Sequence, residues 1–189
     1  AYYTGRLEWE PSNANRSLAA GNGLVVRPVE HAGNGQLSRE EAAEVAKAVH
    51  ALLGSAYTDE QGDTRALGVE DVLVVTPYNA QVRTLKRALP DGARVGTVDK
   101  FQGQEAPVVI VSLASSSGEE APRGLSFVLD RNRINVATAR AQFRFELVCP
   151  PRRLEADCRR IDDMRLVNAL CRFVELATAD VSPSDRSDT

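Results

Sequence analysis

Short apolar segments recur along the chain, separated by polar stretches that contain glycine and proline. Val69–Thr76 is apolar at nearly every position, which is typical of a strand buried on both faces of a parallel sheet. Similar short runs predict further strands at Leu24–Val29, Arg94–Val98, Val108–Leu113, Leu125–Leu129 and Phe143–Val148.

Helices are predicted between these strands. Ser38 and Glu41 have the spacing of a capping box, and an apolar stripe follows until Gly54 ends the helix. Thr76-Pro77 is typical of an N-cap and first helical residue, and further helices are predicted from about Arg131 and after the last strand. Strands that alternate with helices predict a three-layer α/β domain with a mainly parallel sheet.

One domain is expected to span residues 1–179, with loops at residues 8–22 and 54–68. Residues 180–189 are strongly polar and are predicted to form a disordered tail. The first residues lack an initiator Met and run directly into ordered-looking sequence, so the chain is expected to be a piece of a longer protein.

Composition narrows the classes of function. The formal net charge is −3, so any contact with nucleic acid must come from a local patch rather than from the whole domain. The three cysteines, Cys149, Cys158 and Cys171, lack a C-x-x-C spacing, and with only two histidines no zinc site is expected. No apolar stretch is long enough to span a membrane, and a cytoplasmic protein is expected.

The sequence has no phosphate-binding loop. Such a loop needs G-x-x-x-x-G-K-[ST], whose backbone amides hold phosphates while its Lys reaches the terminal ones. The chain has three lysines, Lys47, Lys86 and Lys100, and none follows a glycine. A self-sufficient P-loop ATPase is therefore excluded.

Three polar segments nevertheless lie beside predicted strands, where open α/β sheets build their sites. Residues 76–81 offer an aromatic ring and an amide, residues 96–105 gather hydroxyl, carboxylate, ammonium and amide groups, and residues 130–142 carry arginines suited to phosphate. Taken singly, the first is better explained as a helix cap with a packed Tyr and the third as a solvated surface helix, but the third is not when it is taken with the second. The density of polar groups in the second is harder to explain as a connector.

TPYNAQ, GTVDKFQGQE and NRINVATARAQ resemble motifs IV, V and VI of superfamily 1 helicases, in that order. The resemblance is to the AAA_12-type subgroup that contains the nonsense-mediated-decay RNA helicase and its bacterial DNA relatives. Residues 3–7 resemble the start of the second RecA-like domain. Residues 164–176 resemble the end of bacterial proteins that fuse such a helicase to a RecB-like nuclease.

The resemblance implies the second RecA-like domain of an ATP-dependent motor. Arg140 would be the arginine finger, although the small residue before it, Ala139, departs from the Ser or Thr usual in bacterial members. The other implied nucleotide contacts are Tyr78, Gln81, Gly103 and Glu105, with Arg140 itself.

Thr97, Asp99 and Lys100 would face a nucleic-acid strand, and DNA with 5′-to-3′ movement is the implied preference. The P-loop and the Mg²⁺ ligands that ATP needs would lie in a preceding RecA-like domain of the same protein.

Two alternatives stay open. A non-catalytic RecA-like module that grips nucleic acid or a protein would also lack the P-loop, and the Arg-rich stretch Arg144–Arg172 fits it. A Rossmann-type enzyme needs G-x-G-x-x-G after a strand, whereas Gly21-Asn22-Gly23 precedes one and lacks the third glycine.

Overall fold

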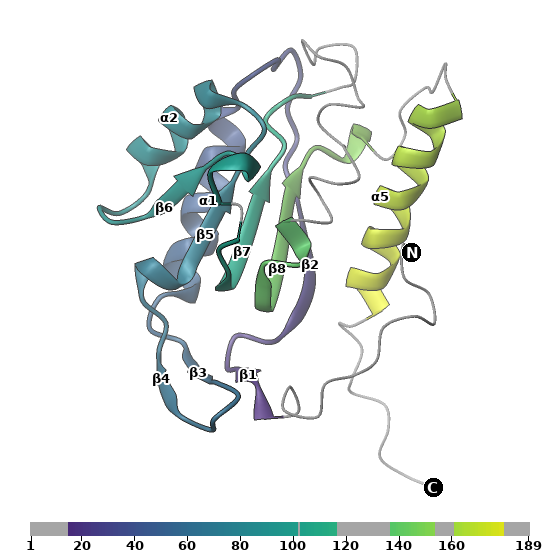
Figure 1. Ribbon diagram of the computed structural model, residues 1–189. Helices are drawn as coiled ribbons and strands as arrows, with labels where there is room; N and C mark the ends of the chain where they lie inside the picture. Colours follow the sequence, from purple (N-terminus) through teal and green to yellow (C-terminus); the bar gives the residue numbers. More distant parts are fainter. Residues whose placement is uncertain (1–14, 102, 117–136, 154–160, 180–189) are drawn as a thin grey trace, which may run out of the picture.

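A five-stranded parallel sheet forms the centre of the protein, shown in Figure 1 as a computed structural model that describes residues 15–101, 103–116, 137–153 and 161–179. The strand order is β2-β8-β7-β5-β6, and every neighbouring pair is parallel. The strands are β2 (Gly23–Pro28), β5 (Val72–Val75), β6 (Arg94–Gly96), β7 (Ala106–Ser112) and β8 (Ala141–Cys149).

Helices cover both faces of this sheet. The first, α1 (Arg39–Leu52), packs on one face together with α2 (Asn79–Ala88), and Val45, Leu85 and Ile110 share their core cluster. The other face is covered by α5 (Ile161–Ala179) and by Phe101 of the 3₁₀ turn η3 (Val98–Phe101). The predicted three-layer α/β fold with a mainly parallel sheet is confirmed, and it is consistent with a RecA-like domain.

The predicted apolar runs coincide with the sheet, with small shifts at their ends. Residues Val69–Asp71 form a 3₁₀ turn, η2, before β5, and all four residues of β5 are buried. The second helix begins at Asn79 with Tyr78 as its N-cap, so the predicted start at Thr76-Pro77 is wrong. The Thr76 N–H still donates to the Gly96 carbonyl at 3.1 Å, which keeps Thr76 in the sheet's hydrogen-bond ladder.

A second, smaller sheet lies in segments expected to be loops. It consists of β1 (Ser17–Leu18), β3 (Ala56–Thr58) and β4 (Thr64–Ala66), all antiparallel. Burial of Tyr57 accounts for it, since its ring packs edge-on against Phe143 at 5.3 Å and lies 4.6 Å from the Arg65 guanidinium. The buried ring of Tyr57, which lies between polar residues, thus stabilises a hairpin within residues 54–68.

Other predicted elements lie outside the described residues: the strand at 125–129, the helix from Arg131 as far as residue 136, and the tail at 180–189. A last 3₁₀ turn, η4 (Pro151–Arg153), follows β8. None of the helices in the described ranges combines the length and apolar character that crossing a membrane requires.

Candidate functional site

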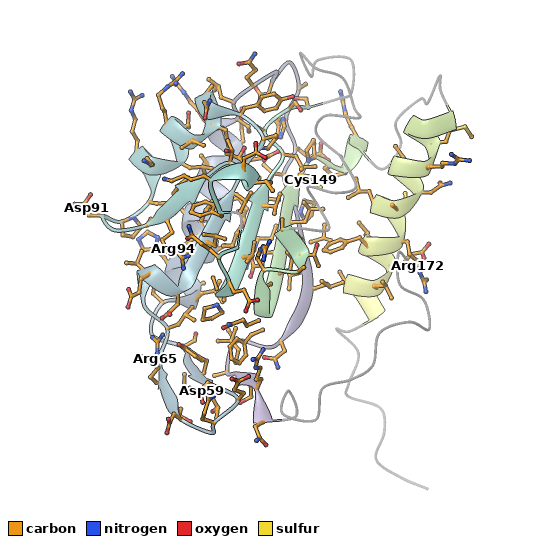
Figure 2. The ribbon with its side chains drawn as sticks, viewed as in Figure 1. Asp59, Arg65, Asp91, Arg94, Cys149 and Arg172 are labelled. Atoms are coloured by element: carbon orange, nitrogen blue, oxygen red, sulfur yellow. The ribbon has the colours of Figure 1, made fainter. Side chains whose placement is uncertain are left out.

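The predicted site residues fall at two opposite edges of the sheet. Because all five strands are parallel, their carboxyl ends meet at one edge and their amino ends at the other. Tyr78 and Thr97 follow β5 and β6 at the carboxyl edge, which is marked by Cys149 in Figure 2. Glu105 and Arg140 directly precede β7 and β8 at the amino edge. The predicted nucleotide contacts therefore divide between the two edges.

At the amino edge, the segments that carry Glu105 and Arg140 are joined through their backbones. The Ala106 N–H donates to the Arg140 carbonyl at 3.0 Å, and the Arg140 N–H donates to the Ala137 carbonyl at 3.2 Å. Glu105 is exposed and accepts a hydrogen bond from Gln142 Nε2 at 3.2 Å. The structure therefore brings Glu105 and Arg140 to adjacent strand ends, as the site prediction requires.

Two further features leave this edge open to a partner. Gly103 is exposed with φ +81°, and a Cβ placed there would meet no atom within 4 Å. Arg140 Nε is buried but has no hydrogen-bond partner among the described residues. Since an unsatisfied buried donor is costly, an acceptor supplied from outside this part of the chain would stabilise Arg140. A guanidinium with an unused donor is suited to phosphate oxygens.

At the carboxyl edge, η3 presents the predicted strand-binding groups. Asp99 and Lys100 are exposed and Thr97 is half-buried. Lys100 Nζ donates to the Val95 carbonyl at 3.4 Å and lies 5.5 Å from the ring of the buried Phe101. These contacts fix the turn while leaving its hydroxyl, carboxylate and ammonium groups near the surface.

Gly96 explains how closely this turn packs on β6. A Cβ at Gly96 would lie 2.7 Å from Lys100 Cδ and 2.8 Å from Phe101 Cε2. Any larger residue would therefore force η3 away from the strand. The glycine is needed here for space, whereas at Gly103 it is needed for backbone conformation.

Tyr78 and Gln81 lie inside the fold. Tyr78 is 6% exposed and belongs to the core cluster on the η3 side of the sheet. Gln81 is fully buried, accepts from the Ser38 N–H at 2.8 Å, and donates to the Ser38 carbonyl and to Ser112 Oγ, each at 3.0 Å. Their nucleotide contacts stay predictions, and the amide of Gln81 is already engaged by protein groups.

Glu41 is the centre of a buried polar network that the sequence did not predict. The Glu41 N–H donates to Ser38 Oγ at 3.0 Å, which is one half of the expected capping box. The other half of a capping box is a hydrogen bond from the Ser38 N–H to the Glu41 carboxylate. That part of the prediction is wrong, because the Glu41 carboxylate points away from Ser38. It bonds His31 Nε2 at 2.9 Å, Ser112 Oγ at 2.6 Å and the Ala114 N–H at 2.9 Å.

This network holds the segment that follows β7. Ala114 has φ +66°, a left-handed conformation that costs energy for a residue with a side chain. Glu41 binds its N–H, and Ser116 Oγ bonds His31 Nδ1 at 2.7 Å and accepts the Asn34 N–H at 2.9 Å. The carboxyl edge of β7 is thereby tied to the start of α1.

A second buried carboxylate, Glu146 of β8, accounts for some of the arginines. It pairs with Arg27 of β2 and accepts from Arg144 Nε at 2.6 Å. Burial opposes ionisation of Arg27, but the hydrogen bond and charge of Glu146 outweigh it and raise the pKa of Arg27. Arg144 also donates to the Ala20 and Gly21 carbonyls. Arg144 is thus a structural residue, which weakens the Arg-rich stretch as support for a simple binding module.

In the described ranges, no three His, Cys, Asp or Glu side chains gather in a way that could hold a metal ion.

These features belong to a known class of domain. The chain matches the family AAA_12, described as an AAA domain, over residues 25–152. This span exceeds half of the 189 residues, so the chain belongs to that family. Several of its similar proteins carry helicase names, which supports its membership of the superfamily 1 helicases.

Three relatives illustrate the similarity. DNA polymerase alpha-associated DNA helicase A of Schizosaccharomyces pombe is 39% identical over 77 residues, covering 39% of this chain and 11% of that protein. The Regulator of nonsense transcripts 1 homolog of Arabidopsis thaliana is 30% identical over 134 residues, covering 66% of this chain and 10% of that protein.

The third, DNA replication ATP-dependent helicase/nuclease JHS1 of Arabidopsis thaliana, is 33% identical over 86 residues, covering 45% of this chain and 6% of that protein. The chain thus spans a small fraction of the length of each of these relatives.

Proposed function

We propose that this chain is the C-terminal motor domain of an ATP-dependent helicase or translocase that acts on single-stranded nucleic acid. The observation that carries the proposal is the amino edge, where Glu105 and Arg140 precede neighbouring strands and Arg140 Nε lacks an acceptor among the described residues. The small fraction of each relative that the chain covers supports a preceding RecA-like domain in the same protein.

In this proposal, Arg140 stabilises negative charge on the γ-phosphate across the cleft between the two domains. Its guanidinium stays ionised and offers several donors to phosphate oxygens, while a metal ion would be held by the other domain. Glu105 contacts the ribose or nucleotide edge, and the open space at Gly103 supports close approach of a ligand or domain there. Tyr78 and Gln81 lie at the opposite edge and fit this role less well.

The nucleic-acid strand lies at the carboxyl edge of the sheet, where η3 presents the side chains of Thr97, Asp99 and Lys100. Two of the similar proteins have names that specify DNA, which supports DNA as the substrate. The proposed 5′-to-3′ movement rests on the motif resemblance alone. The name helicase/nuclease of one relative supports a fused RecB-like nuclease. We place the full-length protein in the cytoplasm.

Arg140→Ala in the full-length protein tests the proposal. Nucleic-acid-stimulated ATP hydrolysis should fall about 10³-fold or more, because the transition-state charge loses its partner. Binding of a fluorescent ATP analogue should change little, since the phosphate cradle lies in the other domain. The matched control is Arg172→Ala on the outer side of α5, where Arg172 contacts Glu175 and both side chains are exposed (Figure 2).

Unchanged turnover in Arg140→Ala would contradict the proposal. The chain alone should hydrolyse no ATP, because it lacks the phosphate loop. Metal-dependent turnover by the purified chain would show that the assignment to half of a shared site is mistaken.

A further inference from the structure

The helix α2 carries a positively charged face. Arg83, Lys86 and Arg87 are all exposed, and α2 contains no acidic residue. Their spacings of three and four residues place them on one side of the helix, opposite the buried Leu85. Figure 2 shows nitrogen-tipped side chains extending from α2 away from the sheet.

Within the described ranges, this face has no acidic side chain as a partner, although Lys86 and Arg87 in the last turn of α2 interact favourably with the helix dipole. Across the described residues, none of Arg83, Lys86 and Arg87 forms an ion pair or a hydrogen bond through its side chain. Several other basic side chains near the surface do have acidic partners: Arg16 with Glu60, Lys47 with Glu44, Arg65 with Asp71, and Arg172 with Glu175.

Acidic residues outnumber basic ones in the chain, 26 to 23, so unpaired positive charge on α2 does not follow from composition. Like charges three or four residues apart also destabilise a helix. An external anion would remove that cost.

The position of α2 indicates which anion. The helix starts directly after Thr76–Tyr78 at the carboxyl edge, where Gln81 ties it to Ser38. It packs beside β6, the outermost strand of the sheet, which leads into Thr97 and η3 (Figure 1). The positive face starts in the second turn of α2 and continues to its last turn, which holds Lys86 and Arg87, so it leads from the carboxyl edge, where the strand-binding groups lie, back towards the start of β6.

We propose that Arg83, Lys86 and Arg87 bind the phosphate backbone of the nucleic-acid strand and extend its path from η3 along α2. This inference rests on the proposed function. Phosphodiester groups fit the face because each Lys or Arg that neutralises a phosphate releases a bound counterion, which makes the interaction favourable and dependent on salt. Such contacts hold a strand without reading its sequence.

The experiment uses the full-length protein and fluorescent single strands, dT and U oligomers of equal length. Anisotropy gives the affinity without nucleotide at several salt concentrations. Arg83→Gln/Arg87→Gln should weaken binding about tenfold at 0.1 M salt, and the slope of log affinity against log salt should become shallower by about 1.4. The matched control is Lys47→Gln/Arg172→Gln, which removes the same charge from α1 and α5 and should bind like the wild type.

Glutamine is a good helix former, so α2 should remain folded, which the unfolding midpoint checks. Arg83→Lys/Arg87→Lys should retain the wild-type salt slope.

Unchanged binding in Arg83→Gln/Arg87→Gln would overturn the inference and favour an acidic protein partner for this face. Equal weakening in the matched control would overturn it as a general charge effect. A wild-type protein that binds neither strand would overturn the proposed function as well.

Discussion

The two edges of the central sheet are built in opposite ways. At the carboxyl edge, Glu41 and Gln81 are fully buried and their polar atoms bond to groups of the same domain. At the amino edge, Glu105 is exposed, Gly103 has open space around it, and Arg140 Nε has no acceptor in the described residues. The network of Glu41 and Gln81 is closed within the domain, although the Thr76 hydroxyl at the same edge is buried without a hydrogen-bond partner among the described residues, whereas the groups at the amino edge are suited to completion from outside.

This difference fits the proposed division of work. A surface that binds a nucleic-acid strand must be held in position by its own domain, and buried hydrogen-bond networks supply that rigidity. A half-site that closes around a nucleotide must leave groups unsatisfied until the other half arrives. The comparison predicts that substitutions at the carboxyl edge mainly lower stability, while those at the amino edge mainly lower turnover.

The largest effect on stability is expected for Glu41→Gln. The new amide would place a donor against the Ser112 hydroxyl or the Ala114 N–H, so a buried network would lose its central acceptor. The free energy of unfolding should fall by about 3 kcal/mol. Urea denaturation measures it.

Glu44→Gln on the same helix is the matched control, because Glu44 is part-exposed and pairs with Arg27 and Lys47 near the surface. It should cost less than about 1 kcal/mol. Equal losses for the two variants would contradict a closed network at the carboxyl edge.

A pair of glycine substitutions compares the edges directly. Gly96→Ala should lower the free energy of unfolding by about 2 kcal/mol, because the added methyl group would overlap Lys100 and Phe101. Gly103→Ala should cost about 1 kcal/mol, because the methyl has room and only the backbone at φ +81° is strained. Urea midpoints of the two variants test the order, and a larger loss for Gly103→Ala would break the comparison.

The smallest effect concerns Glu40, at the rim of the network. Hydrogen bonds from its own backbone N–H, then from Ser38 and Asn34, lower the pKa of its carboxyl group. The folded pKa lies below the unfolded one, so ionised Glu40 stabilises the fold above the unfolded value, and this stabilisation disappears as pH falls through the lower, folded value.

Glu40→Gln should therefore be slightly less stable than the wild type at pH 7, by less than about 1 kcal/mol because the side chain is exposed. The difference should shrink as the pH falls and vanish once the pH lies below the lowered pKa of the folded state. Parallel urea titrations measure this difference in the free energy of unfolding. If it persists at that low pH, packing rather than the charge of Glu40 causes it.

Much of the fold follows from local pattern. The runs around Val72–Val75 and Val108–Val111 are apolar because both faces of a central parallel strand are buried, so their positions could be predicted. The residues at the strand ends could also be located, since Thr97, Glu105 and Arg140 each adjoin an apolar run.

Long-range contacts explain what could not be predicted. Glu41 has the spacing of a capping box, but its carboxylate partners Ser112 and Ala114 lie more than 70 residues away. Tyr57 orders a polar hairpin by packing against Phe143, also distant in sequence. The division of the site between two edges likewise depends on strand direction, which spacing between motifs does not reveal.

The central claim is that the amino edge serves the nucleotide and the carboxyl edge serves the strand. In the full-length protein, Arg140→Ala and Lys100→Ala should be compared by turnover at saturating strand and by strand affinity without nucleotide. The account predicts that Arg140→Ala loses about 10³-fold in turnover with unchanged strand affinity, whereas Lys100→Ala weakens strand binding about fivefold. Wild-type turnover in Arg140→Ala, or a loss of strand affinity in that variant as large as in Lys100→Ala, would contradict it.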